Sequence, residues 1–600
     1  MRCPILIRGL CVATGLLALV PSSPAQETFH YLARLGFTDA EHTSSDGVQH
    51  STVTRAAHVG VFAGTSVRYA GGLSSSPLGN TAWLAGPDGS TRRVGFYDAA
   101  HTFADGRKDS GIVALNDCGM AAGYSARQEG LSAWIATLCG GTRAVGFYGA
   151  EYKFPNGHHH SEVLELNKQG KVIGYSERND GGRTAWLILD PRKPVVLGLT
   201  DAQHVSPTGQ RWSSPADLSD SGYVAGQTRQ YVGAARGQTA WMRPPSGTAR
   251  PVGLYGGIYT ATNGSHHNHA QFVSKTGYVA GVADTFHGDV RAATVAWIAR
   301  PSGQAVRVGL YDAVHVSLDG RSGLSVFGDS YSEAPEINDN GYAVGYSERR
   351  GTGSGQTAWV GSPDGQTRIV GLYDEEHSLS GGHVYSWGYW LTNSGYFLGQ
   401  SNRWGQGNGS FLGSSAWFAD VHGNTTRIGL FGRSNYGPSD SFSEFASGIT
   451  ESGYIWGFST VYTYGGGTLL GVTPWIYHIP TRTLTHLAIS PRPSVGIALG
   501  QVNHVLKNGV AFGTYRKFGD GDADLGDRAF VWVPGKGAFD IGERLDVPMS
   551  DEGWEMLDDA VATAWSGRLI AGTGILAEAT NPGSQGVWLV SRGPMPAWLQ

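Results

Sequence analysis

Charged residues are scarce in this chain, and neither sign dominates. They make up 16% of the 600 residues, with 44 Lys and Arg against 49 Asp and Glu, so the net charge is −5 at neutral pH. A nucleic-acid-binding protein needs a basic surface to meet the phosphate backbone, and this composition excludes such a partner. Past the N-terminus no apolar run approaches the roughly 20 residues of a membrane helix, so we expect no membrane span.

Signatures of several enzyme classes are also missing. The chain has no Gly-x-Ser-x-Gly elbow, no phosphate-binding loop and no His-Glu-x-x-His pair. Carboxylates that a glycoside hydrolase needs on both sides of the scissile bond are present at Glu162, Glu165, Glu177 and Glu348, but nothing in the sequence pairs them. No organic cofactor is expected.

Cysteine is rare, and half of it lies in an N-terminal leader. Basic Arg2 and Arg8 precede an apolar run over residues 12–20 and a small-residue site ending at Ala25. This pattern predicts a signal peptide over residues 1–25 and a mature chain, residues 26–600, that is secreted or periplasmic. Cys11 lies at the start of the apolar run and not after it, so we expect no lipid anchor.

After cleavage only Cys118 and Cys139 remain. Both fall in predicted turns of one repeat unit. An oxidising compartment favours a disulfide between them, and two free thiols are the alternative.

Glycine, in contrast, is abundant and regularly placed. The chain holds 90 glycines and 11% aromatic residues. A recurrent pattern joins an aliphatic strand, an Asn/Ser-Asp-x-Gly turn, a second Gly four residues later and a strand with one Trp. The first glycine of the turn recurs at Gly60, Gly119, Gly170, Gly222, Gly277, Gly341, Gly395, Gly453, Gly509 and Gly567. The Trp follows at Trp83, Trp134, Trp186, Trp241, Trp297, Trp359, Trp417, Trp475, Trp532 and Trp588.

A period in the mid-fifties with short strands and glycine turns indicates an all-β propeller, because one small sheet cannot bury its faces alone. We read four strands in each unit: a before the glycine turn, b through the second Gly, c at the Trp, and d ending in Val-Gly-Leu-Tyr. Residues 29–36 resemble a strand d that would complete the last unit. The sequence therefore predicts one ring of about ten four-stranded units, and a seven-bladed ring with three accessory units is the alternative.

The strand order also predicts two different faces. Antiparallel neighbours place the a–b and c–d turns on one face, and the longer b–c loops and the links between units on the other. Function is expected on the face with the long loops.

The links between units carry a recurrent Asp-x-x-His pair. It occurs at Asp39 and His42, Asp98 and His101, Asp201 and His204, Asp312 and His315, and Asp374 and His377. Recurrence in five units predicts a structural role, with the Asp holding a turn.

Two links break this pattern together. Gly149 and Gly256 replace the Asp, and Tyr152 and Tyr259 replace the His. Histidines follow at His158, His159, His160 and at His266, His267, His269. Duplication of one unit or a solvated loop would explain this, but ionisable groups that converge before the innermost strand are also what proton transfer requires. These histidines could also bind zinc, but no Cys accompanies them and they show no regular spacing on one element.

The Asn-Asp-x-Gly-x-x-x-Gly-Tyr-Ser units followed by Ala-Trp resemble extracellular repeats of secreted bacterial proteins with a His-Ala-Phe motif. Together with the Gly-Leu-Tyr-Asp-x-x-His links, they also resemble the β-propeller ulvan lyases, which are seven-bladed polysaccharide lyases. That resemblance implies β-elimination on a uronate-containing polysaccharide, sulfated or not, with Tyr and His as acid and base and Arg binding the carboxylate.

The candidate catalytic residues are therefore Tyr152, Tyr259 and both His clusters. Substrate-binding candidates are Arg178, Arg229, Trp212 and Tyr231, although arginines at similar positions of other units favour loop bracing, and aromatic residues often pack between sheets. Oxygen ligands for structural calcium are predicted at Asp520, Asp522, Asp524 and Asp527. A monomer acting on polysaccharide is expected, and a non-catalytic propeller that binds glycans or cell-surface partners is the alternative.

Overall fold

The computed structural model describes most of the chain. It covers residues 27–69, 76–190, 193–232, 235–315, 324–325, 337–349, 355–379, 381–405, 409–430, 442–462, 468–494, 496–577 and 584–593. The predicted signal peptide lies outside the described residues.

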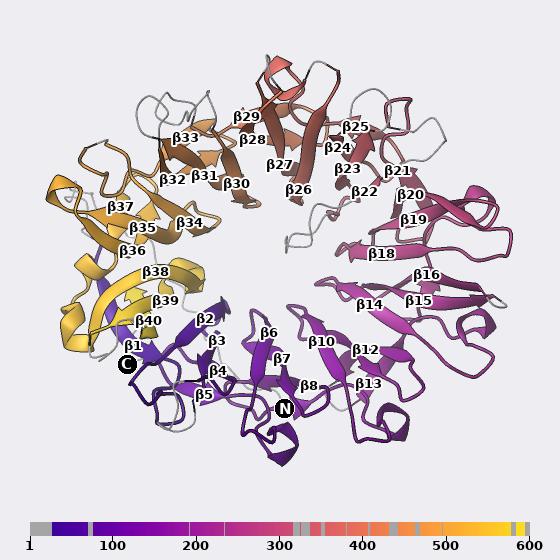
Figure 1. Cartoon of the computed structure of the whole chain (residues 1–600), viewed down its shortest axis with the longest axis horizontal. Coiled ribbons are helices and arrows are strands. Elements are labelled where there is room, and N and C mark those ends of the chain that lie inside the picture. The colour runs from indigo at the N-terminus through magenta and orange to yellow at the C-terminus, as the bar shows by residue number, and fades with distance from the viewer. Residues whose placement is uncertain are drawn as a thin grey trace, which may run out of the picture.

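The described residues form ten small antiparallel blades, two of which share one sheet, arranged around a central opening (Figure 1). The first five blades contain β2 (Ser51–Ala56), β3 (Phe62–Val67), β4 (Asn80–Ala85), β5 (Thr91–Arg93); β6 (Ser110–Leu115), β7 (Met120–Ala126), β8 (Leu131–Thr137), β9 (Arg143–Ala144); β10 (Ser161–Leu166), β11 (Val172–Glu177), β12 (Arg183–Asp190), β13 (Lys193–Leu197); β14 (Ser213–Leu218), β15 (Val224–Val232), β16 (Ala235–Arg243), β17 (Arg250–Pro251); β18 (Asn268–Val273), β19 (Val279–His287), β20 (Val290–Ala299) and β21 (Ala305–Val308).

The other five blades contain β22 (Leu324–Ser325), β23 (Ala343–Arg349), β24 (Gly355–Gly361), β25 (Thr367–Ile369); β26 (Val384–Leu391), β27 (Tyr396–Trp404), β28 (Phe411–Asp420), β29 (Thr425–Ile428); β30 (Glu444–Ile449), β31 (Tyr454–Tyr462), β32 (Leu469–His478), β33 (Thr483–His486); β34 (Gly500–Val505), β35 (Ala511–Phe518), β36 (Asp524–Val533), β37 (Gly537–Asp540); β38 (Trp554–Ala564), β39 (Leu569–Leu576), β40 (Gln585–Arg592) and β1 (Phe29–Leu35). Blades 6 and 7 are joined by a short parallel pairing of β24 with β26.

The described helices are short 3-10 turns in the connections. They are η1 (Ala99–His101), η2 (Ala150–Tyr152), η3 (Ala202–His204), η4 (Gly257–Tyr259), η5 (Glu375–His377), η8 (Asp520–Asp522), η9 (Gly542–Arg544), η10 (Met549–Glu552) and η11 (Trp565–Gly567). None of the helices in the described part of the chain is long and apolar enough to cross a bilayer.

The N-terminal strand closes the ring, as the sequence predicts. β1 pairs antiparallel with β40, from Phe29 opposite Arg592 to Leu35 opposite Val587, and so supplies the fourth strand of blade 10. Phe29 and Leu35 are fully buried. A single ten-bladed propeller is therefore confirmed over a seven-bladed ring with accessory units (Figure 1).

Each blade is held by a Gly–aromatic contact between strands b and c. In blade 3, Gly174 lies opposite Trp186, and a Cβ on Gly174 would sit 2.4 Å from the indole. Blade 9 departs from the prediction. Phe530, and not Trp532, lies opposite Gly513 and fills the core, while Trp532 is only half-buried two residues further along β36.

The links between blades begin earlier than the sequence suggests. Strand d ends before the glycine of the Val-Gly-Leu-Tyr segment, because this glycine adopts a left-handed conformation, as Gly95 does with φ of 98°. A Cβ on Gly95 would lie 2.7 Å from the Ser110 hydroxyl of the next blade. The glycine therefore lets the chain turn closely over the following sheet.

The recurrent Asp-x-x-His pair is a structural clip. Asp98 caps η1, His101 Nδ1 lies 2.7 Å from its carboxylate, and His101 Nε2 lies 2.9 Å from Ser132 Oγ on strand c of the next blade. His42, His204, His315 and His377 make equivalent contacts. In a catalytic Asp–His–Ser triad the serine hydroxyl is exposed to the substrate. Here the Asp is exposed, and the His and the hydroxyl are buried. The predicted structural role of the pair is therefore confirmed.

The disulfide favoured by the sequence is not present. Cys118 lies in the a–b turn of blade 2 and Cys139 in its c–d turn, and both are exposed free thiols. Antiparallel order places both turns on one face of the propeller, but the two thiols do not meet.

One buried carboxyl departs from the repeat. Most blades begin strand a with a small polar residue such as Ser161, which hydrogen-bonds to Ser176 of strand b. Blade 8 has Glu444 there, fully buried, and its nearest cation, Arg427, is 4.0 Å away and already bound to Glu376. Burial raises the pKa of Glu444 to about 9.

We expect Glu444→Gln to stabilise the protein above pH 6. The folded-state pKa lies above the unfolded value of about 4.5, so the folded state binds the proton more tightly and loses stability as pH rises from about 4.5 to 9. At pH 7 the cost is roughly 3 kcal/mol. Calorimetry should show a melting temperature higher by about 2 °C or more at pH 8 and unchanged at pH 4.5. The exposed control Glu555→Gln should change neither, and equal pH dependence of Glu444→Gln and wild type would contradict this.

Candidate functional site

The first histidine cluster lies where the chain enters the innermost strand of blade 3. His158 and His160 directly precede β10 and are partly exposed, with 24% and 18% of their side chains accessible. They stand at the end of β10 opposite the a–b turn, which is the face that carries the links and b–c loops. We call this the loop face and the opposite one the turn face.

Strands a and b of blade 3 add two ionisable groups beside these histidines. Tyr175 on β11 is the cross-strand partner of Glu162 on β10, and its hydroxyl donates to the Glu162 carboxylate. His160 Nε2 lies 3.3 Å from the same carboxylate and 3.5 Å from the Tyr175 hydroxyl. An imidazole, a phenol and a carboxylate therefore meet at one point.

Positive charge surrounds this point from blades 3 and 4. The Arg183 guanidinium stacks on the Tyr175 ring at 3.7 Å and lies 3.5 Å from Glu177. Trp212, at the entry to blade 4, lies between Arg183 and Arg229, at 5.6 and 5.2 Å from the two guanidinium carbons. Arg229 has no carboxylate partner among the described residues.

We call His158, His160, Glu162, Tyr175, Glu177, Arg183, Trp212 and Arg229 the blade 3 cluster. Its protonation follows from its contacts. The hydrogen bond from His160, supported by the one from Tyr175, holds the pKa of Glu162 below its usual value. Burial and the hydrogen bond to Glu162 raise the pKa of Tyr175. At neutral pH the cluster therefore holds an ionised Glu162 and a protonated Tyr175.

Two candidates from the first unit lie beneath this cluster. Tyr152 is buried and takes the place of the clip histidine, with its hydroxyl 3.1 Å from Thr184 Oγ1. His159 is also buried, stacks on Tyr148 and directs Nδ1 toward the Tyr152 carbonyl. Neither side chain faces the exposed part of the cluster.

The second histidine cluster lies in blade 5, with blade 4 between the two. His266 Nε2 is 2.8 Å from Thr239 Oγ1, and burial lowers the pKa of His266 to about 4. Burial also lowers the pKa of His269, while His267 packs near Phe286. Tyr259 packs against the core of blade 5. No contact between described residues joins these side chains to the blade 3 cluster.

Of the four predicted substrate-binding residues, two belong to the blade 3 cluster and two do not. Trp212 and Arg229 belong to the blade 3 cluster. Arg178 instead binds Glu151 at 2.9 Å and Asp180 at 3.0 Å, which braces its loop. The Tyr231 hydroxyl lies 3.4 Å from Gln210 and outside the cluster.

Three of the four predicted calcium ligands form ion pairs with arginines. Arg516 binds both Asp524 and Asp527, at 2.6 and 3.0 Å, and Arg492 binds Asp522 at 3.0 Å. Calcium needs six to eight oxygen ligands around one point, so the carboxylates as arranged do not fit the ion unless Arg516 moves. We therefore expect no Ca²⁺ binding at these carboxylates. Calorimetric titration with Ca²⁺ of the chelator-treated protein and of its Asp524→Asn variant tests this expectation.

Ligand atoms of His158, His160 and Glu177 lie within 4.8 Å of one another, a spacing that suits a transition-metal ion. Glu177 also binds Arg183, so a metal would compete with that ion pair.

Sequence reasoning missed Tyr175, Glu162 and Arg183 as a group. Tyr175 belongs to a Gly-Tyr-Ser pattern shared with Tyr124 and Tyr346, which made it look structural. The available signal was local. Glu162 follows His160 by two residues, and antiparallel pairing places Glu162 opposite Tyr175.

No protein-family model matches the chain, and no curated protein matches it. Among solved structures, a prolyl endopeptidase has 12% identity and a TM-score of 0.31 over 71% of this chain, and the chain covers only 54% of that enzyme. Polysaccharide lyase Uly1 has 10% identity and a TM-score of 0.28, covering 86% of this chain and 98% of its own. The lectin BP39L from Burkholderia pseudomallei has 10% identity and a TM-score of 0.26, covering 64% of this chain and 100% of its own. The β-propeller fold of this chain rests on its own sheets and their closure, and these weak similarities assign no function.

Proposed function

We propose that the protein is a polysaccharide lyase that cleaves a uronate-containing chain, ulvan-like in the first instance, by β-elimination at the blade 3 cluster. The observation that carries this proposal is the meeting of Tyr175 and His160 at Glu162, beside an arginine with no carboxylate partner among the described residues. β-Elimination needs a base, an acid and a positive charge next to the uronate carboxylate, and the cluster supplies all three.

Arg229 is proposed to bind the uronate carboxylate. Its guanidinium rests on Trp212 and keeps its hydrogen-bonding edge available for a bidentate contact. Neutralising that carboxylate lowers the free energy of the enolate-like state that forms when the neighbouring C5 proton leaves. Trp212 also offers an aromatic face for a sugar ring.

His160 and Tyr175 are proposed to move the protons. The Nε2 edge of His160 faces Glu162, which leaves Nδ1, for which the described residues offer no partner, to accept the C5 proton. The raised pKa of Tyr175 keeps its phenol protonated, so its hydroxyl can turn from Glu162 and donate its one proton to the leaving glycosidic oxygen. The C5–H and C4–O bonds break, a C4–C5 double bond forms, and no water is consumed.

A hydrolase is less consistent with this geometry. An inverting or retaining glycosidase needs one carboxyl kept protonated as the acid, but the pKa of Glu162 is lowered and Glu177 is bound to Arg183. Glu165 does keep its proton, since burial raises its pKa to about 9. However, Glu165 and Asp217 both accept the N–H of Leu218, so no sugar fits between these two carboxyls.

Ultraviolet absorbance tests the proposal, because β-elimination creates a conjugated unsaturated uronyl end. We expect absorbance to rise when the mature protein meets one of a panel of uronate polysaccharides, with ulvan first. New reducing ends without absorbance would instead indicate a hydrolase. Binding of polysaccharide with neither product would indicate a glycan-binding propeller, and both outcomes would reject the lyase.

We also propose that the protein is exported and acts as a monomer. The basic start and apolar run of residues 1–25 support export. Mass spectrometry of the protein from a native culture supernatant should find an N-terminus at Gln26, and retention of the leader would reject this.

A further inference from the structure

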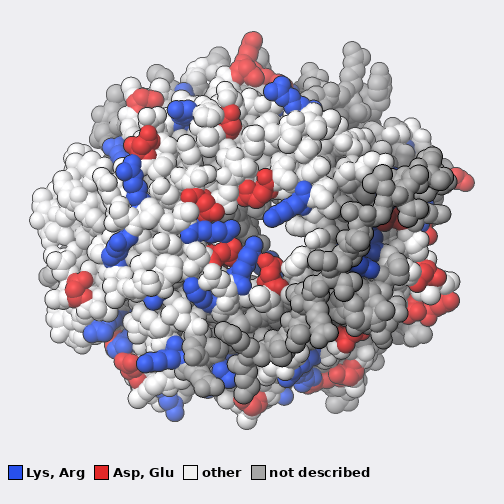
Figure 2. Space-filling view, turned by 180° about the vertical axis from the view of Figure 1, so that it is seen from behind, with Lys and Arg blue, Asp and Glu red and all other residues white. Residues whose placement is uncertain are grey.

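The a–b turns carry a ring of polar and mostly charged side chains on the turn face, opposite the blade 3 cluster. The ring is formed by the second residue of each turn, namely His58, Asp117, Lys168, Asp220, Lys275, Asp339, Asn393, Glu451 and Lys507 in blades 1–9. Figure 2 shows side chains of both signs gathered around the central opening. β10 links the two faces, with His160 before its first residue and Lys168 two residues after its last.

From blade 2 to blade 8 neighbouring turns contact one another through ion pairs or backbone hydrogen bonds. Lys168 lies 3.7 Å from Asp117 and 3.8 Å from Asp220, and Lys275 lies 3.5 Å from Asp220. The backbone N–H of Lys275 donates to Asp339, and that of Asn393 donates to Glu451. Each turn is thus held by a side chain of its neighbour.

This sequence of contacts breaks between blades 9 and 1. The Lys507 carbonyl accepts a hydrogen bond from Ser452, but its ammonium group has no acidic partner among the described residues. The rings of His58 and His504 likewise have no hydrogen-bonding partner in the described part of the chain. Lys507, His58 and His504 are all exposed.

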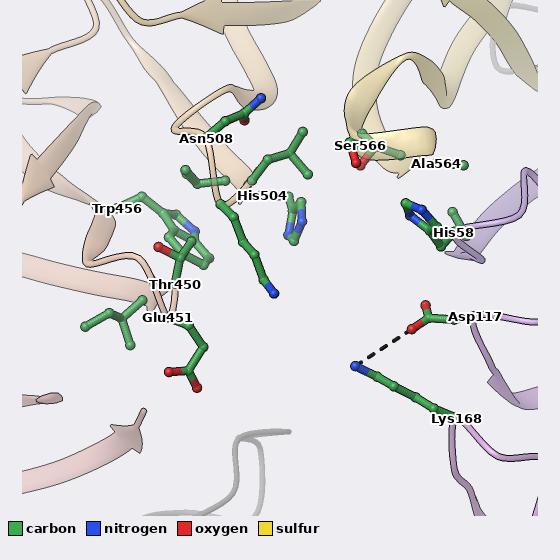
Figure 3. A pocket seen from close by; sticks show the side chains of 16 residues that line it. His58, Asp117, Lys168, Thr450, Glu451, Trp456, His504, Asn508, Ala564 and Ser566 are labelled. Carbon is green, nitrogen blue, oxygen red and sulfur yellow. Dashed lines mark ion pairs between the residues drawn. The ribbon is translucent and has the colours of Figure 1, made fainter. Parts of the chain in front are cut away.

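A cavity of about 630 Å³ opens at this break. His58, His504, Lys507 and Lys168 line it together with the hydroxyls and amide of Thr450, Thr563, Ser566 and Asn508. Figure 3 shows His58, His504, Lys168 and Asp117 directed toward a common space. Of the two acidic residues in its wall, Asp117 is bound to Lys168 and Glu451 accepts two backbone N–H groups. Two ammonium groups and two carboxylates therefore line the cavity, and among these four the Lys507 ammonium is the one for which the described residues show no partner.

One aromatic surface also lines the cavity. Trp456 is half-buried and meets His504 edge to face, with ring centroids 6.3 Å apart. An indole beside hydroxyl, amide and ammonium groups suits a sugar ring, because the ring can stack while its polar substituents are hydrogen-bonded. A bare inorganic anion would leave the indole and the amide unused.

We propose that this cavity is a second binding site for a carboxylate- or sulfate-bearing sugar, with Lys507 as the residue that pairs with the anionic group. The site is separate from the proposed lyase centre, because the two lie at opposite ends of the innermost strands. Its occupant is a single anionic sugar or the end of a chain. The proposal of this second site does not depend on whether the blade 3 cluster cleaves polysaccharide.

Calorimetric titration with D-glucuronate tests the site, since this monosaccharide has no glycosidic bond to cleave. We expect Lys507→Met to weaken binding by about 10-fold or more. Lys275→Met is the matched control, because it holds the same turn position but is paired with Asp220. It should bind as wild type does.

Four outcomes would overturn the proposal. Wild type that does not bind glucuronate at millimolar concentration would reject the site, and equal loss in both lysine variants would reject the role of Lys507. Equal affinity for inorganic sulfate and for glucuronate and glucose 6-sulfate would reject a sugar as the occupant. Retained binding in Arg229→Met would separate this site from the lyase centre, and loss of binding in that variant would place glucuronate at the blade 3 cluster instead.

Discussion

Removal of residues 27–36, which contain β1, should leave the propeller unable to close and should abolish its cooperative melting. Blade 10 would lose its outer strand, and β40 would expose the backbone edge that now pairs from Arg592 to Val587. Burial of Phe29 and Leu35 would also be lost, at about 1.5–3 kcal/mol each. We expect aggregation, or an apparent melting temperature lower by about 10 °C or more, in calorimetry and size-exclusion chromatography.

A matched rescue separates loss of closure from loss of mere chain length. Arg592 lies opposite Phe29, so the end of β40 adjoins the start of β1. Moving residues 27–36 to follow Gly593 through a short turn would rebuild the same antiparallel pair as an ordinary c–d hairpin. We expect this rearranged chain to melt close to wild type. Normal melting of the deleted chain would contradict the importance of closure.

The repeat made the architecture predictable because each unit needs the same contacts. A Gly on strand b and an aromatic ring on strand c must meet in every blade, so their spacing alone located the sheets. Blade 9 shows the limit of this reasoning. Trp532 matches the spacing, but Phe530 fills the core, since the register of β35 and β36 is set by pairing and not by residue type.

The site was only partly predictable for a related reason. Its histidines were visible because they interrupt a repeat, which is how His158 and His160 were found. Tyr175 was hidden because it obeys the repeat, and its special contact arises only from Glu162 across the strand pair. Arg183 and Trp212 meet between two blades, and no local pattern encodes that contact.

The same reasoning explains why Tyr152 was an attractive candidate. It interrupts the Asp-x-x-His pattern, as a catalytic residue would, yet its hydroxyl contacts Thr184 in the way that a clip histidine contacts strand c. A change of residue type within a repeat can therefore preserve a structural contact.

Tyr175→Phe should lower turnover of the cleaved polysaccharide by about 100-fold or more while leaving the fold intact. The change removes the proposed acid together with its hydrogen bond to Glu162, while the ring can still stack under Arg183. Tyr124→Phe is the matched control, since Tyr124 occupies the same repeat position in blade 2 but lies opposite Gly111, which has no carboxylate. Initial rates from ultraviolet absorbance, together with melting temperatures, measure both effects.

His160→Asn provides the second arm of this test. If His160 and Tyr175 serve one elimination step, each single change removes most of the proton-transfer contribution, and the double variant should lose less than the product of the two single losses. Fully multiplicative losses would indicate independent roles. An unchanged rate in Tyr175→Phe would remove the phenol from the mechanism. The imidazole of His160, which contacts Glu162, would then be the remaining proton donor of the two.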